Sequence, residues 1–311
     1  MSNATLIHTR QQLLERVLIC ILTTVPCFVC LFINCALLFT LRSKPLFRDT
    51  SRYILLYNLL FADTALLVQN HLMYILAVCR ITLTYPVCGV LTMLANLTTA
   101  ICFLTLAVMS LERYVAVCYP LRHTTIITIR NTEVAIIVVW AFSALSILTR
   151  VTLLLNLQFE KLQSLQMKYF CGKESILLDP MLDLYDTSIT YCLFGSTGVA
   201  VSCSYIGVII AARSASTDKA SARKAANTLL LHLVQLGLSF FSTIRNPILI
   251  AISQVLEGIT LLYMQIFFYV YFNIFPRCLT SLIYGIRDQT IRPLFVYNLC
   301  CQCRGSLSVT L

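Results

Sequence analysis

Seven long apolar runs occupy most of this 311-residue chain, and they constrain its fold more than any other feature. The hydrocarbon core of a bilayer is about 30 Å thick, so a helix that crosses it needs roughly 20 predominantly apolar residues. Every run is long enough to meet that requirement. The predicted spans are 17–41, 53–77, 89–111, 134–155, 187–212, 226–250 and 260–284.

Composition supports a membrane protein. Hydrophobic residues make up 59% of the chain and charged residues 12%, whereas soluble domains average about 45–50% and about 25%. The connections between the runs are too short for a separate soluble module. We therefore expect one all-α membrane domain over residues 1–311, a bundle of seven transmembrane helices.

The distribution of charge predicts the orientation of the bundle. If the first loop is cytoplasmic, the Lys and Arg residues concentrate on the cytoplasmic side, as the positive-inside rule requires. The net charge of +10 is then a topology signal, with nucleic acid a poor candidate partner. We expect residues 1–16 to be extracellular, residues 285–311 to form a cytoplasmic tail, and the chain to lie in the plasma membrane. The first run is too long for a signal-peptide core.

Two segments near the ends carry possible modification sites. Asn3 begins an N-glycosylation sequon on the expected outer side. A second sequon, which begins at Asn96, falls inside the third span and should be inaccessible. After the seventh span, residues 287–295 suggest a short amphipathic helix that lies on membrane lipid. Three cysteines follow it, either as palmitoylation sites or as unmodified thiols: Cys300, Cys301 and Cys303.

Polar residues inside two of the spans indicate a mid-bundle site. Asn34 interrupts the first run, and such a side chain usually hydrogen-bonds a neighbouring helix. Asp63 lies in the second run, where a carboxylate is costly and is a functional hypothesis by default.

Several motifs occur in order along the chain and resemble those of a known family. They are Met109–His123, Ser204–Tyr205, Lys219–Ser221 with His232–Leu233, and Pro276–Asp288. On these residues the chain resembles the vertebrate odorant receptors of the rhodopsin-like G-protein-coupled receptor superfamily, and most closely a fish-type subgroup. Three departures stand out. Thr280-Ser281 replaces the family's Asn-Pro pair, Glu112 replaces the usual Asp, and Cys171 is alone in its loop.

The resemblance implies a disulfide and a switch. Cys88, at the start of the third span, would pair with Cys171 in the long loop, and Cys79 would stay unpaired. An electrostatic latch would form at the cytoplasmic end, where Arg113 is released to a heterotrimeric G protein when the sixth helix moves. The residues assigned to this switch are Glu112, Arg113, Tyr114, Tyr205 and Tyr284.

The same resemblance raises a question about Asp63, which in this superfamily often helps to bind sodium. Arg277 lies about one helical turn before Ser281, deep in the seventh span. We hypothesise an Asp63–Arg277 ion pair that substitutes for sodium. Arg277 could equally reach a backbone carbonyl or water.

The ligand site is expected between the outer halves of the helices. Ala95 stands where amine receptors hold an Asp, and Ile274 where opsins hold the retinal Lys, so neither an amine counter-ion nor a Schiff base is present. Arg245 could meet an acidic ligand or extend to lipid headgroups. The candidate pocket residues are Ala95, Asn96, Thr99, Tyr191, Arg245, Tyr269, Tyr271 and Phe272.

Function follows from these patterns as a set of alternatives. The first is an odorant receptor that binds a small-molecule odorant and activates a stimulatory G protein, which raises cyclic AMP. The second is a receptor of the same superfamily for a non-odorant ligand. A seven-span transporter is a third, which the lack of an internal repeat disfavours. No motif predicts an enzyme, a cofactor or a metal site, because the four histidines are scattered.

Overall fold

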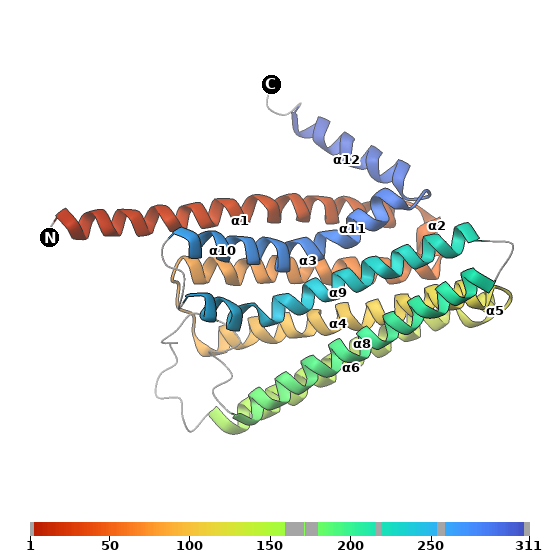
Figure 1. Ribbon diagram of the computed structural model, residues 1–311, viewed down its shortest axis with the longest axis horizontal. Helices are drawn as coiled ribbons and strands as arrows, with labels where there is room; N and C mark the ends of the chain where they lie inside the picture. The colour runs from red at the N-terminus through yellow and green to blue at the C-terminus, as the bar shows by residue number, and fades with distance from the viewer. Residues whose placement is uncertain (1–2, 159–170, 172–179, 215–218, 254–258, 308–311) are drawn as a thin grey trace.

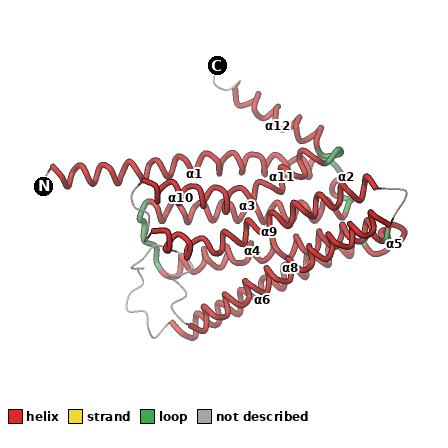
Figure 2. The backbone as a smooth tube through the Cα atoms, in the orientation of Figure 1, coloured by secondary structure: helices red, strands yellow, loops and turns green. Residues whose placement is uncertain are grey.

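A computed structural model of the chain describes residues 3–158, 171, 180–214, 219–253 and 259–307. Helices account for nearly all of these residues and run side by side along one axis (Figures 1 and 2). The long helices are α1 (Asn3–Ser43), α3 (Ser51–Val78), α4 (Tyr85–Cys118), α6 (Ile129–Gln158), α8 (Pro180–Ser214) and α9 (Lys219–Ser253). The short helices are α2 (Pro45–Arg48), α5 (Pro120–Ile126) and α12 (Arg292–Leu307).

The last span is divided into three parts. It consists of α10 (Ile259–Tyr269), a π-helical segment η1 (Val270–Ile274) and α11 (Phe275–Arg287). Pro276 lies in the first turn of α11. A proline in a continuous helix removes one hydrogen bond and clashes with the carbonyl four residues earlier. The wider turn of η1 adapts the helix to it, and the Phe275 amide bonds to the Val270 carbonyl. The π-helical segment in this span therefore ends nearly two turns before Thr280-Ser281.

Six helices in the described residues are long and apolar enough to cross a membrane. They are α1, α3, α4, α6, α8 and the α10–α11 span. The further helix, α9, is less apolar because its buried face carries His232, Gln235 and Ser239. Their spacing places them on one side of the helix, toward the bundle. Together these helices form a seven-helix bundle, followed by the short helix α12.

Each helix continues beyond the span predicted for it. The largest difference is at the beginning, where α1 already starts at Asn3 and includes most of the segment expected as a polar N-terminal lead. Likewise, α8 begins at Pro180, seven residues before the predicted span 187–212, and therefore includes Asp186. Helical hydrogen bonds satisfy the backbone on both sides of the apolar zone, so a helix does not have to end where its apolar residues end.

Apolar side chains form both the interior and the exterior of the bundle. The main core cluster joins α1, α3 and α4, with Leu37, Leu56, Leu60, Ile101 and Leu106 almost completely buried. Large apolar side chains are also exposed along α6 and α8, as expected for helices that face lipid.

The two ends of the bundle are named after residues near them. We call the end where α4 begins the Cys88 end. We call the opposite end, which holds α2, α5 and the start of α12, the Arg113 end (Figure 1).

Candidate functional site

A buried carboxylate near the middle of α3 is the centre of the candidate site. Asp63 is fully buried, and donors from three other helices surround it. Arg277 Nη1 lies 2.8 Å from Oδ1 and the Cys102 thiol 3.3 Å from Oδ1. The Thr280 hydroxyl lies 3.0 Å from Oδ2 and Gln235 Nε2 3.4 Å from Oδ2. Each oxygen therefore accepts two donors, and the guanidinium supplies the counter-charge that a buried carboxylate requires.

A second layer of hydrogen bonds extends this site to α1. Gln235 Nε2 also donates to the Thr280 hydroxyl over 3.0 Å. The Ser281 hydroxyl donates to Asn34 Oδ1 over 2.6 Å, and Asn34 Nδ2 donates to the Arg277 carbonyl over 3.4 Å. Thr280 and Ser281 thus contribute two side-chain donors where the family pattern has Asn-Pro. The network joins α1, α3, α4, α9 and α11.

The sequence left open whether Arg277 pairs with Asp63 or with a carbonyl or water, and the structure contains the ion pair. Sequence reasoning missed Gln235. The available signal was the polar spacing of His232, Gln235 and Ser239, whose side chains are all buried within an otherwise apolar run. That spacing marks a polar stripe on the inward face of α9.

The motif at the Arg113 end forms a second charged cluster. Arg113 Nε lies 3.3 Å from Glu112 Oε2, and His123 Nε2 lies 3.8 Å from Glu112 Oε1. The hydroxyl of the buried Tyr284 on α11 lies 3.4 Å from Nε2 of His232 on α9. Tyr284 therefore ties α11 to α9.

An ion pair fixes the junction between α11 and α12. Arg52 Nη2 lies 2.7 Å from Asp288 Oδ2, and its guanidinium carbon lies 5.7 Å from the centre of the Tyr284 ring. Asp288 Oδ1 accepts the amide of Thr290 over 2.9 Å. The carboxylate therefore both pairs with α3 and orders the turn that leads into α12.

The other two aromatic residues of the predicted switch lie between α4 and α8. Tyr205 is partly buried and packs with Val208 and Leu229 where α8 meets α9. The Tyr114 ring packs so closely on Gly207 that a β-carbon there would overlap it. Tyr205 therefore lies where α8 would separate from a moving α9, whereas Tyr114 lies between α4 and α8.

A polar triad that the sequence did not reveal connects α3, α4 and α6. Asn58 Nδ2 donates to the Thr105 hydroxyl over 2.9 Å, and Trp140 Nε1 donates to Asn58 Oδ1 over 2.9 Å. All three residues are far apart in the sequence, so only tertiary packing shows that they meet.

A buried ion pair connects α6 to α8 toward the Cys88 end. Arg150 Nη2 lies 3.0 Å from Asp186 Oδ1, and the side chains are only 5% and 3% exposed. Each neutralises the other between two helices, so neither has to reach water.

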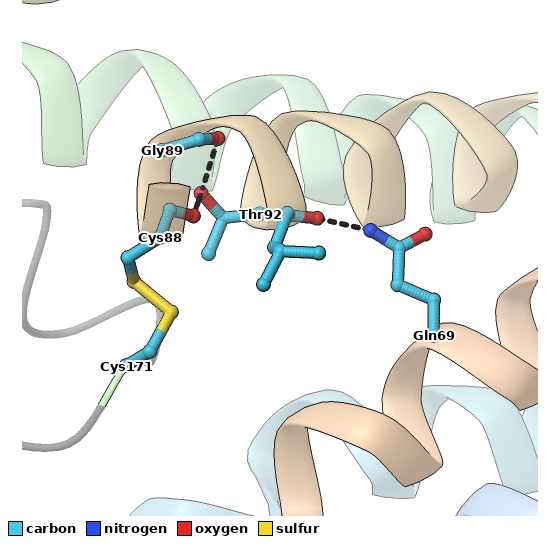
Figure 3. The surroundings of a disulfide bond; sticks show 6 residues. Gln69, Cys88, Gly89, Thr92 and Cys171 are labelled. Atoms are coloured by element: carbon cyan, nitrogen blue, oxygen red, sulfur yellow. Dashed lines mark hydrogen bonds between the residues drawn. A yellow bond between two sulfur atoms is a disulfide. The ribbon is translucent and has the colours of Figure 1, made fainter. Parts of the chain in front are cut away.

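The disulfide joins the start of α4 to the connection that follows α6. Cys88 and Cys171 are bonded, with their Cα atoms 5.5 Å apart (Figure 3). The Thr92 hydroxyl donates to the Cys88 carbonyl over 3.0 Å, and Gln69 of α3 donates to the Leu91 carbonyl. The pairing implied by the family resemblance is therefore present, on a helix end that is itself held by α3.

Tyr269, a predicted pocket residue, belongs to an aromatic and polar cluster. Its ring stacks on Tyr74 with centroids 3.7 Å apart. Its hydroxyl lies 3.2 Å from Nδ1 of His71, whose Nε2 lies 3.1 Å from the Thr24 hydroxyl. Tyr269 therefore packs α10 against α1 and α3.

Two other predicted pocket residues point away from the interior, which corrects our expectation. Tyr191 is 54% exposed and Tyr271 is 50% exposed. Tyr271 shares a face with the exposed Phe267 and Phe275, four residues on either side. Residues four apart lie on one face of a helix, so this stripe faces outward. The sequence did not reveal the rotation of the helix that decides this.

The remaining pocket candidates divide into two groups. Ala95, Asn96 and Thr99 are partly buried on α4, and the Thr99 hydroxyl donates to the Ala95 carbonyl over 2.7 Å. Phe272 packs among phenylalanine rings of α9 and α10. The side chains of Arg245 and Asn3 and those of the three tail cysteines, Cys300, Cys301 and Cys303, lie outside the described residues.

Comparison with known proteins identifies the family of this chain. The family model of the seven-transmembrane receptors of the rhodopsin family matches residues 33–284. The chain belongs to that family. It is similar to Odorant receptor 131-2 of Danio rerio, with 30% identity over 88% of this chain and 83% of that one. Olfactory receptor 2A1/2A42 of Homo sapiens is 29% identical over 61% of this chain and 60% of its own.

This rhodopsin-family receptor lies in the odorant-receptor branch, and receptors of this kind are not enzymes. Within the described ranges, no group of three His, Cys, Asp or Glu side chains is placed to hold a metal ion.

Proposed function

We propose that this receptor binds a small-molecule odorant within the helix bundle and activates a stimulatory, olfactory-type G protein, which raises cyclic AMP. The similarity to an odorant receptor over most of both chains supports the ligand class. The family supports G-protein coupling. The structural observation behind the proposed activation mechanism is the pair of polar contacts that α9 makes through His232 and Gln235.

The orientation is part of the proposal. We place the receptor in the plasma membrane with its N-terminus outside and α12 in the cytoplasm. Exposed basic residues at the Arg113 end support this, namely Lys44, Arg48, Arg122 and Arg130. Basic residues near span ends favour the cytoplasmic side. Glycosylation of Asn3 on the outside and palmitoylation of the tail cysteines remain predictions.

Two polar contacts hold α9 in the resting bundle. His232 meets the Tyr284 hydroxyl, and one turn further along the helix Gln235 reaches both Asp63 and Thr280. Outward movement of α9 breaks both contacts. Arg113 and Tyr284 are then free to rearrange, which opens the surface that receives the G protein. A ligand activates the receptor if it binds the open state more tightly than the closed one.

In this mechanism, Arg277 takes the role of an internal cation at Asp63. The resemblance implies a sodium ion near this carboxylate. Here four donors already cover both oxygens, and the guanidinium is one of them. A separate cation would have to displace the Arg277 side chain, which is 7% exposed and anchored at its backbone by Asn34.

The test is cyclic AMP production in cells that express the intact chain, challenged with a panel of small water-soluble odorants. We expect a response from the wild type, none from Arg113→Ala at equal surface expression, and a retained response from Arg122→Ala. Arg122 is the matched control because it is an exposed arginine at the same end. Equal responses from wild type and Arg113→Ala would overturn the proposal. A cyclic AMP response that persists in cells lacking stimulatory G proteins would exclude coupling through those proteins.

A further inference from the structure

The short helix α5 is held in place by little more than its own backbone. It lies at the Arg113 end of the bundle (Figure 1), none of its side chains is buried, and Leu121 is 95% exposed. It has seven residues, and helices of that length are marginal in water without an apolar face to pack. Segments with few buried contacts open locally at a small cost in free energy. We therefore expect α5 to unfold locally while the bundle stays intact.

Three residues of α5 suit the substrate cleft of a protein kinase. Arg122 is exposed, the exposed Thr125 follows three residues later, and Ile126, which is 43% exposed, comes next. Basophilic kinases bind an extended segment through an arginine three residues before the acceptor hydroxyl, because its guanidinium pairs with carboxylates of the kinase. In the closed helix the Thr125 hydroxyl donates to the Arg122 carbonyl over 2.8 Å. Opening of α5 therefore also frees the hydroxyl.

The structure disfavours the other hydroxyls that have this spacing. In the described ranges, three others follow an arginine by three residues: Ser51, Thr280 and Thr290. Ser51 and Thr280 are only 9% and 1% exposed. Thr290 is exposed, but its amide bonds to Asp288 Oδ1 over 2.9 Å and the next residue, Ile291, is fully buried. A kinase would reach these three only by unpacking the bundle or its junction with α12.

We propose that Thr125 is a phosphorylation site for a basophilic protein kinase and that the phosphate keeps α5 open. The proposal rests on the orientation given above, with the Arg113 end in the cytoplasm, where ATP is present. The Thr125 hydroxyl oxygen attacks the γ-phosphorus of ATP and forms the threonine phosphate ester. The bond from that phosphorus to the departing oxygen of ADP breaks, ADP takes the electron pair, and the hydroxyl proton passes to the catalytic carboxylate of the kinase.

The position of the phosphate explains why α5 stays open. It adds about two negative charges in the last turn of α5, where the helix end already carries partial negative charge. Arg122 precedes the phosphate, and a base that precedes an acid is the weaker order for a pair on a helix. The same helix holds His123, whose Nε2 lies 3.8 Å from Glu112 Oε1. Opening of α5 removes this neighbour of Glu112, so the modification acts on the charged cluster at the Arg113 end.

The experiment phosphorylates the purified full-length receptor in detergent. Mg²⁺-ATP and the catalytic subunit of cyclic-AMP-dependent protein kinase, a basophilic kinase, are added, and phosphopeptide mass mapping locates the phosphate. We expect it on Thr125 in the wild type and absent from that peptide in Thr125→Ala. Arg122→Gln should be labelled more slowly by roughly tenfold or more, because one charge pair with the kinase is lost. Thr124→Ala is the matched control, since this exposed neighbour follows no arginine by three residues, and its labelling should equal that of the wild type.

Several results would overturn the choice of site. Phosphate on Ser51 or Thr290 in place of Thr125 is one, and unchanged labelling of Arg122→Gln is another. The wild-type map decides the question even if a variant fails to fold. Receptor recovered from cells with phosphatase inhibitors present should carry the same phosphate. Labelling in detergent but never in cells would refute the proposal, because Thr125 would then lie beyond the reach of cytoplasmic kinases.

Hydrogen exchange tests the effect on α5. The amides of residues 120–126 should exchange several-fold faster in the phosphorylated receptor than in the same sample after phosphatase treatment. Equal exchange would refute the opening of the helix. None of these readouts needs an odorant or the production of cyclic AMP by the receptor, so the proposed receptor function and this modification can fail separately.

Discussion

The Asp63–Arg277 pair offers the sharpest test of the reasoning, by a double-mutant cycle. Arg277→Met keeps an unbranched, flexible side chain and removes its charge, and Asp63→Asn removes the opposite charge. The two side chains are 7% and 0% exposed and 2.8 Å apart. Breaking such a buried pair from one side typically costs about 3–5 kcal/mol, whereas replacing both partners by neutral groups costs much less.

The structure refines these magnitudes. In Arg277→Met the carboxylate keeps donors from Thr280, Cys102 and Gln235, so we expect a loss near the lower figure, about 3 kcal/mol. Asp63→Asn leaves the guanidinium buried without its counter-charge, so we expect about 5 kcal/mol. The double variant should lose about 1 kcal/mol, for the hydrogen bonds that remain imperfect.

Thermal unfolding of the detergent-purified receptor measures the effect. With an unfolding entropy of about 2.1 cal/mol/K per residue, this chain should shift by about 1.5 °C per kcal/mol. The single variants should therefore melt roughly 5–8 °C below wild type and the double variant within about 2 °C of it. Buried thiols such as Cys27 and Cys102 provide the signal, because a thiol-reactive dye labels them only on unfolding. If the two single shifts simply add in the double variant, the residues are not coupled and our assignment of the pair is wrong.

Three further predictions test other parts of the network. Gln235→Leu removes the tie of α9 to the mid-bundle carboxylate, so ligand-free cyclic AMP should rise several-fold; unchanged basal signalling at equal expression would count against the tie. Trp140→Phe removes the 2.9 Å bond to Asn58 and should lower the melting temperature by about 1.5 °C, for a loss of about 1 kcal/mol. Gly285→Val should push the Phe295 ring away, because a β-carbon at this position would lie 2.6 Å from it. We expect α12 to detach from α11, seen as faster proteolysis of the tail, and a protease-resistant tail would refute this.

The tertiary structure brought together some residues that the sequence suggested as partners, and it showed that other side chains point in a direction different from the one we expected. The Asp63–Arg277 hypothesis rested on two opposite charges at similar depth in different spans, and the structure brings them together. Tyr191 and Tyr271 were placed in the pocket by analogy of position. The exposed stripe that contains Tyr271 shows that the rotation of each helix decides which way such a side chain points. Apolar residues surround these helices on all sides, so hydrophobic periodicity carried little information about that rotation.

The sequence by itself determined the number and order of the apolar helices, because crossing a bilayer demands long runs without charge. It also located the charged residues that such helices tolerate only with partners. Only the tertiary structure decided which partners meet. Gln235 with Asp63, Trp140 with Asn58, and Arg150 with Asp186 all come from separate helices. Contacts of that kind depend on the rotation and depth of whole helices, which are fixed when the bundle packs.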